Sequence, residues 1–151
     1  MEEIWKSLEF LGYPWDMVSN LGRVKSLERP VWTGKNWTTK KERIRKQTID
    51  NNGYAQVGLC NGKVKTYGVH RLVAMAFIPN PKKKTQVDHI DTNPLNNCVD
   101  NLRWVTPWEN CNNPLTKKHQ SDRMKGNTIW KDTHKKRDRE APSTFHPLLT
   151  T

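Results

Sequence analysis

Val87-Asp88-His89 is the stretch around which the chain is organised, and Asn101 and Asn110 follow it within a short span. Gln86-Val87 is typical of the beginning of a strand, and the turn-forming residues after His89 predict a loop. Arg103-Trp104-Val105 predicts a second strand. An acidic residue beside a histidine, with two amides nearby, can hold one hard divalent cation and place one general base next to it.

A helix is predicted directly after the second strand. Thr106 suits the N-cap, Pro107 suits the first helical position, and Glu109 completes a capping box. Asn110 then falls just inside the helix. This order of strand, loop, strand and helix is expected to bring the amide of Asn110 back toward Asp88.

The residues of this motif suit a metal-assisted hydrolysis, which needs an activated water and stabilisation of negative charge. His89 is the candidate general base, because the pKa of an imidazole lies near working pH. Asp88 and Asn110 offer oxygen ligands to Mg²⁺ or a similar hard ion. The competing interpretation is a turn-rich loop in which Asp and Asn side chains cap the backbone, and it suits Asp91, Asn93, Asn96 and Asn97.

These residues resemble a known family. Three separated sub-motifs occur in order and at workable spacing, and they are similar to those of the HNH endonucleases, whose site is a ββα-metal fold. The closest resemblance is to the homing endonucleases of phages and introns, and it covers roughly residues 1–113. The matching segments are Trp5 and residues 18–24 (both weaker), then residues 69–74, 87–91, 96–97, 100–106 and 109–110.

The resemblance implies a fold and further roles. The implied fold class is α+β, with a small β-rich N-terminal module followed by a ββα-metal nuclease fold. Asn101 takes the position of the family's middle asparagine, which implies that its amide or carbonyl orients the catalytic histidine. Asn110 stands where many members have histidine. That difference lowers the expected affinity for transition metals and favours Mg²⁺ or Mn²⁺.

The composition of the chain limits the kinds of binding partner that we expect. The chain has 151 residues, only 34% of them hydrophobic, and a formal net charge of +11. These values predict a modest core and a polyanionic partner, which we expect to be double-stranded DNA bound by a monomer. No long apolar run indicates a membrane, and the acidic first residues do not resemble a signal peptide. The three cysteines form no CxxC pair, which predicts neither a disulfide framework nor a structural zinc site. Such cysteine usage is typical of a reducing compartment, so we expect the protein in the cytoplasm of a bacterial or phage-infected cell.

The basic excess lies beside the motif. Residues 29–66 hold nine Lys or Arg against two Asp or Glu, whereas residues 67–113 hold five against four. Cations neutralise phosphates, and the interleaved Trp32 and Trp37 can stack or wedge. The alternative is a solvated loop whose tryptophans pack on the core. The predicted phosphate-contacting residues of this segment are Lys40, Lys41, Arg43, Arg45 and Lys46.

Two elements are expected between the basic segment and the motif. Asn61-Gly62 is a strong type I′ turn signal between alternating strands, and such a ribbon can lie in a DNA groove. Lys63 and Lys65 either face that groove or form a solvated face. Apolar residues at positions 69, 72, 73, 76 and 77 predict a helix that ends before Pro79.

Three charged or titratable side chains have open roles. Arg71 lies off the apolar stripe of the predicted helix and is a candidate DNA contact. His70 is expected to be structural or to contact phosphate rather than to be catalytic. Arg103 is either a phosphate clamp or a member of a structural ion pair with Asp91 or Asp100.

We therefore predict three segments: a basic, β-rich DNA-binding module over residues 1–66, a nuclease domain over 67–113, and a basic, disordered tail over 114–151. The expected function is a metal-dependent DNA endonuclease that nicks one strand or cuts both. The alternative is a catalytically decayed DNA-binding protein derived from such an enzyme. An RNA-binding protein is less well supported, because no aromatic RNA-recognition signature is present.

Overall fold

The computed structural model describes residues 2–114 and residue 117. The chain divides into two units, residues 1–110 and 111–151. The predicted disordered tail over 114–151 lies outside the described residues except at positions 114 and 117. Among the described residues, no helix is long and apolar enough to cross a lipid bilayer.

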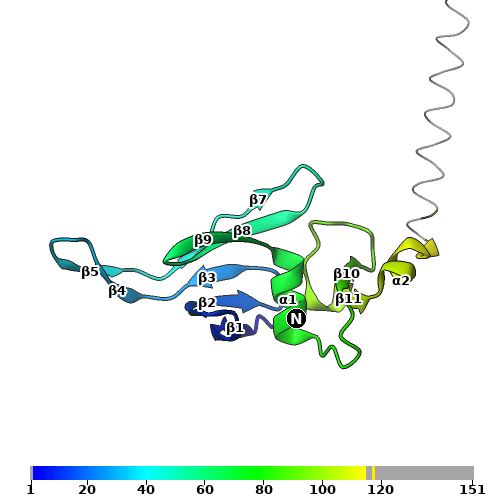
Figure 1. Cartoon of the computed structure of the whole chain (residues 1–151), viewed down its shortest axis with the longest axis horizontal. Helices are drawn as coiled ribbons and strands as arrows, with labels where there is room; N and C mark the ends of the chain where they lie inside the picture. Colours follow the sequence, from blue (N-terminus) through cyan, green and yellow to red (C-terminus); the bar gives the residue numbers. More distant parts are fainter. Residues whose placement is uncertain (1, 115–116, 118–151) are drawn as a thin grey trace, which may run out of the picture. The chain divides into compact units, whose positions relative to one another are not determined.

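Short antiparallel strands build the N-terminal half (Figure 1). A four-stranded sheet has the order β1-β2-β3-β6, β4 pairs with β5, and β7 is the outer strand of a sheet with β8 and β9. Gly22 has a φ of +82° in the turn between β2 and β3, a backbone conformation that glycine adopts readily. The bounds are β1 Trp5–Leu8, η1 Glu9–Leu11, β2 Tyr13–Ser19, β3 Val24–Ser26, β4 Arg29–Trp32, β5 Trp37–Lys40, β6 Arg43–Ile44 and β7 Thr48–Ile49.

The basic segment contains a β-hairpin that the sequence pattern did not predict. β4 and β5 pair from Arg29↔Lys40 to Trp32↔Trp37, and Figure 1 shows this hairpin projecting from the other sheets of its unit. No period-2 apolar pattern marks these strands, because neither face of the hairpin is fully buried. Trp32 and Trp37 do not pack on the core, so that alternative is wrong; they are 52% and 70% exposed.

The second hairpin and the helix that follows it agree with the sequence pattern. β8 (Ala55–Asn61) and β9 (Lys63–Gly68) pair in register, and Gly62 between them has a φ of +80°. α1 covers Val69–Phe77 and buries its apolar stripe, as predicted.

One hydrophobic core joins the two modules. Leu8, Val18 and Val24 of the N-terminal sheet are fully buried in the same cluster as Leu59 and Leu72 of β8 and α1. The turn of residues 20–22 also meets the loop before β11, since the Val99 amide donates to the Asn20 carbonyl oxygen at 2.8 Å. Residues 67–110 therefore do not pack separately from the predicted N-terminal module.

The motif itself forms a strand, loop, strand and helix. β10 (Gln86–His89) pairs antiparallel with β11 (Leu102–Val105), η2 (Val99–Asn101) lies in the loop between them, and α2 covers Pro107–Cys111. The capping box is present, because the Thr106 amide donates to Glu109 Oε2 at 2.7 Å and the Glu109 amide donates to Thr106 Oγ1 at 3.2 Å. The α+β class is confirmed, and β10, β11 and α2 form the expected ββα motif.

Candidate active site

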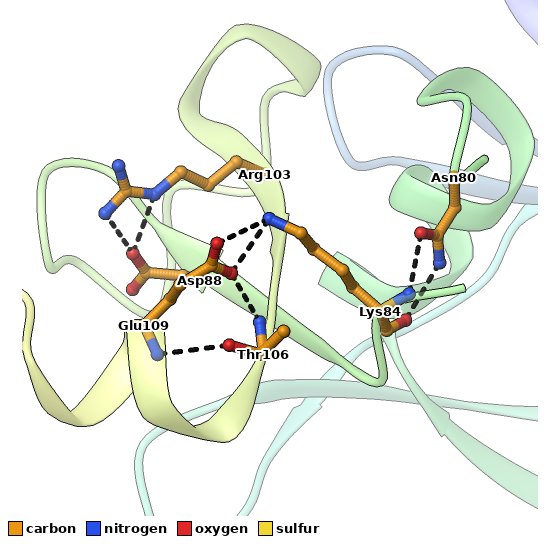
Figure 2. Close-up of polar contacts among 6 residues, drawn as sticks. All are labelled: Asn80, Lys84, Asp88, Arg103, Thr106 and Glu109. Atoms are coloured by element: carbon orange, nitrogen blue, oxygen red, sulfur yellow. Dashed lines mark hydrogen bonds and ion pairs between the residues drawn. The ribbon is translucent and has the colours of Figure 1, made fainter. Parts of the chain in front are cut away.

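Asp88 lies directly opposite Arg103 in the ladder between β10 and β11. The guanidinium donates to Asp88 Oδ2 through both Nε, at 3.0 Å, and Nη2, at 2.7 Å (Figure 2). Asp88 is buried, whereas the side chain of Arg103 is 48% exposed. The predicted ion pair of Arg103 with Asp91 or Asp100 is wrong, because cross-strand pairing places Arg103 next to Asp88 instead.

His89 is buried at the end of β10, and its Nε2 lies 3.2 Å from Asn97 Oδ1. The Asn97 amide nitrogen donates to the Leu95 carbonyl oxygen, which turns Oδ1 toward the imidazole. Since Oδ1 can only accept, Nε2 is the donor of this hydrogen bond, so in a neutral imidazole the lone pair that a general base needs is on Nδ1.

Two aromatic rings complete the surroundings of His89. The ring centroids of His70 and Tyr54 lie 5.3 Å and 5.9 Å from that of His89, and 5.2 Å from each other. Burial lowers the pKa of His70 to about 4, with the nearby His89 adding to this effect, so His70 is neutral at pH 7. Its Nδ1 is buried without a hydrogen-bond partner. A structural role for His70 fits this packing.

Asn101 fastens the loop and does not contact the imidazole through its side chain. Its Nδ2 donates to Asp91 Oδ1 at 2.8 Å and to the Asn96 carbonyl oxygen at 2.9 Å, and its Oδ1 accepts from the Asp91 amide. The expectation that its amide orients His89 is therefore corrected, because Asn97 supplies that hydrogen bond. The sequence interpretation missed Asn97, treating it as a turn residue, although it stands beside Asn96 in the motif.

Asn110 is linked to the motif strand through Gln86. Its Nδ2 donates to Gln86 Oε1 at 2.9 Å, and Gln86 and Asp88 lie on the same face of β10 because side chains alternate along a strand. This leaves Oδ1 as the Asn110 atom available for another partner. Among residues 2–114 and 117, no three His, Cys, Asp or Glu side chains form a metal-binding cluster. One carboxylate and one amide oxygen are nevertheless a donor set that suits Mg²⁺, which keeps several waters.

An ion pair between Lys84 and Glu109 supports the start of α2. Lys84 Nζ lies 2.8 Å from both carboxylate oxygens, and the Lys84 backbone is held at both its amide and its carbonyl by Asn80 (Figure 2). The hydrogen bond from Lys84, together with that from the Thr106 amide, lowers the pKa of Glu109 to about 2. Glu109 therefore stays charged at any working pH and keeps the cap in place.

The predicted DNA contacts separate into exposed and engaged side chains. We call Lys40, Lys41 and Arg43 the cation row; all three are exposed, as are Lys46, Lys63 and Lys65. Arg71 is exposed and donates to the Thr85 carbonyl oxygen at 3.4 Å.

Arg45 is different and is removed from the candidate contacts. Its Nε donates to Asp16 Oδ1 at 2.7 Å and its Nη1 to the Gly58 carbonyl oxygen at 3.2 Å. Its side chain is 12% exposed, and that of Asp16 is 2% exposed. The guanidinium serves a structural ion pair, which a count of charges along the sequence does not reveal.

Two family models match the chain: the NUMOD4 motif over residues 3–60 and the HNH endonuclease over residues 67–111. The chain belongs to the HNH endonuclease family. The matched HNH segment contains Asp88, His89, Asn101 and Asn110.

Several relatives are similar to this HNH protein. The DNA endonuclease I-HmuI of Bacillus phage SP01 is 41% identical over 86 residues, 56% of this chain and 49% of that protein. A putative HNH homing endonuclease, YosQ, derived from the SPbeta prophage in Bacillus subtilis, is 46% identical over 88 residues, 55% of this chain and 51% of YosQ. The chain spans between 25% and 51% of the length of the curated relatives it matches.

A solved structure supports the same assignment. The structure described as DNA binding and cleavage by the HNH homing endonuclease I-HmuI aligns with a TM-score of 0.61 and 34% identity, covering 82% of this chain and 66% of that one. HNH nucleases generally use a divalent metal ion.

Proposed function

We propose that the protein is a metal-dependent DNA endonuclease, of the homing or phage-encoded type, with His89 as its general base. The observation that carries this proposal is the hydrogen bond between His89 Nε2 and Asn97 Oδ1, because it leaves Nδ1 to accept a proton. His89 follows Asp88 directly at the end of β10, so their Cα atoms are about 3.8 Å apart.

The reaction is a hydrolysis of one phosphodiester bond. His89 Nδ1 takes a proton from a water, the water oxygen bonds to phosphorus, and the bond to the leaving 3′ oxygen breaks as that oxygen gains a proton from solvent. Asp88 and the Oδ1 of Asn110 would hold Mg²⁺ or Mn²⁺, and that ion supplies Lewis-acid stabilisation of the charge on the phosphate when bound.

Arg103 is proposed to bind a phosphate oxygen at the same place. A guanidinium has five N–H donors, and only Nε and Nη2 are directed to Asp88. The remaining donors lie on a half-exposed side chain. Asn101 acts indirectly, by holding the loop that carries Asn97.

Residues 1–66 are proposed to bind double-stranded DNA, with the protein acting as a monomer. The cation row, Lys46, Lys63 and Lys65 are exposed and are not opposed by a comparable number of acids. Because such contacts release counterions, they strengthen binding to any sequence. Arg71 on α1 is a further candidate contact of the same kind.

A plasmid-nicking assay tests this function. The purified protein is expected to relax supercoiled plasmid in Mg²⁺ or Mn²⁺ and to lose that activity in EDTA. His89→Ala should abolish nicking with nearly unchanged DNA affinity, and Asp88→Asn should abolish nicking with weaker metal binding. Asp100→Asn is the matched control, because Asp100 is an exposed acid of the same loop.

The outcomes separate the candidate functions. Wild-type activity in His89→Ala would remove His89 as the base. A protein that binds DNA without nicking it under any metal would instead be the catalytically decayed form.

A further inference from the structure

Two neighbouring tryptophans are exposed to solvent at the end of the β4–β5 hairpin. Trp32 and Trp37 are cross-strand partners whose ring centroids are 5.6 Å apart with planes tilted by 56°. Their exposed fractions are 52% and 70%. A tryptophan is among the largest apolar groups a protein can bury, so leaving two together in solvent forgoes substantial stabilisation. A paired exposed patch of this kind marks a contact surface.

The tip of the hairpin holds the pair in place before any partner binds. The Thr33 amide donates to the Asn36 carbonyl oxygen at 3.1 Å, and the Asn36 amide donates to Thr33 Oγ1 at 3.2 Å. Gly34 between them has a φ of +91°. Because this turn is closed by its own hydrogen bonds, a partner would not have to order it, which favours binding.

The two faces of the hairpin differ. Alternation places Pro30 and Thr39 on the face of the two tryptophans, and Arg29 and Lys40 on the opposite face. Residues 29–41 contain four Lys or Arg and no Asp or Glu. The hairpin therefore combines an uncharged aromatic face with cations on its opposite face and at its two ends, which fits a polyanion that also offers apolar groups.

Duplex DNA offers both features within one groove. A two-stranded ribbon fits the major groove, which is about 12 Å wide, but not an undistorted minor groove of about 6 Å. The walls of the major groove are phosphates, and on its floor every thymine presents a 5-methyl group. We propose that Trp32 and Trp37 are base-contacting residues that lie in the major groove against thymine methyl groups. This inference rests on the proposed function and names how that function's DNA is recognised.

The test removes the methyl groups and nothing else. The full chain is used to select duplexes from a random pool, and the selected duplex is remade with deoxyuridine in place of thymidine. We expect wild type to bind the thymidine duplex more tightly, by about fourfold for each methyl group that it buries. Trp32→Ala/Trp37→Ala should lose affinity for the thymidine duplex and bind both duplexes equally. Trp32→Phe/Trp37→Phe should retain the preference, since phenylalanine also contacts the thymine methyl.

Controls separate the methyl contact from binding to phosphates, single strands or membranes. Lys40→Gln/Lys41→Gln should weaken binding to both duplexes by the same factor, because phosphates do not depend on the methyl group. Equal binding of both duplexes by wild type, or an unchanged preference in the alanine variant, would overturn the inference. So would a loss in the alanine variant confined to single-stranded DNA or to vesicles of anionic phospholipid. Nicking by wild type without methyl dependence defeats only this inference, whereas the absence of DNA binding defeats the proposed function as well.

Discussion

Replacing Gly22 with alanine tests whether the N-terminal module positions His89, the proposed general base. Gly22 has a φ of +82°, and a Cβ at this position would lie 2.7 Å from Asn97 Cβ and 3.2 Å from the Asn97 carbonyl oxygen. Left-handed backbone costs alanine about 1–2 kcal/mol. The clash with a well-packed neighbour adds about 1–3 kcal/mol. We expect Gly22→Ala to lose about 2–5 kcal/mol of unfolding free energy.

Gly12→Ala is the matched control. Gly12 has a φ of +85°, but a Cβ there would meet nothing within 4 Å. It should therefore show only the backbone cost of about 1–2 kcal/mol. The difference between the two variants measures the contact between residue 22 and Asn97, and in thermal unfolding it should be about 4 °C or more.

Nicking kinetics complete the test of Gly22. Displacing Asn97 removes the oxygen that accepts from His89 Nε2, so kcat should fall by about tenfold in Gly22→Ala, part of the ~10²–10⁴ that a positioned general base supplies. Gly12→Ala should retain the wild-type kcat at a temperature where both variants are folded. Equal stability and equal kcat in the two variants would refute the idea that the turn between β2 and β3 positions Asn97.

Three further predictions concern charged and titratable groups. Arg45→Met should destabilise the fold by about 3 kcal/mol in urea titrations, because it leaves the Asp16 carboxylate buried and unpaired. The double variant with Asp16→Asn should recover most of the lost stability. An Arg45→Met variant as stable as wild type would mean that the ion pair is dispensable. Neutralising the cation row should lower the slope of log K against log salt by about 2.7, at ~0.9 for each phosphate contact. Arg45→Met should leave that slope unchanged, and the opposite pattern would restore Arg45 as a DNA contact. The pKa of His70 falls to about 4 in the folded chain, so the unfolded chain binds more protons between pH 6.5 and pH 4. The free energy of unfolding should therefore drop by about 1–2 kcal/mol as the pH falls through that range. The drop should be smaller in His70→Phe.

Local signals predicted most of the nuclease motif because its elements are specified by neighbouring residues. The capping box at Thr106 and Glu109 and the stripe of α1 both formed as expected. The β4–β5 hairpin was missed, since an exposed ribbon needs no alternation of apolar and polar residues. Long-range partners were also hidden: nothing near Arg45 in the chain identifies Asp16, which is 29 residues away.

The histidine's partner shows the same limit in the site. Asn97 and Asn101 are both asparagines in a turn-rich loop, and only the folded path of that loop decides which amide faces His89. The pairing of Asp88 with Arg103 likewise depends on strand register. By contrast, the candidate ligands and the candidate base were proposed from residue type and order alone.

The shared core determines whether the two matched segments can be expressed as separate fragments. Family models treat residues 3–60 and 67–111 as two motifs, but Val18 and Val24 are buried in one cluster with Leu72. A gene fragment cut near residue 66 would encode two pieces, each with an unsatisfied apolar side, and neither should fold alone. Grafting the HNH domain onto another DNA-binding domain would therefore require residues 2–110 to be transferred together.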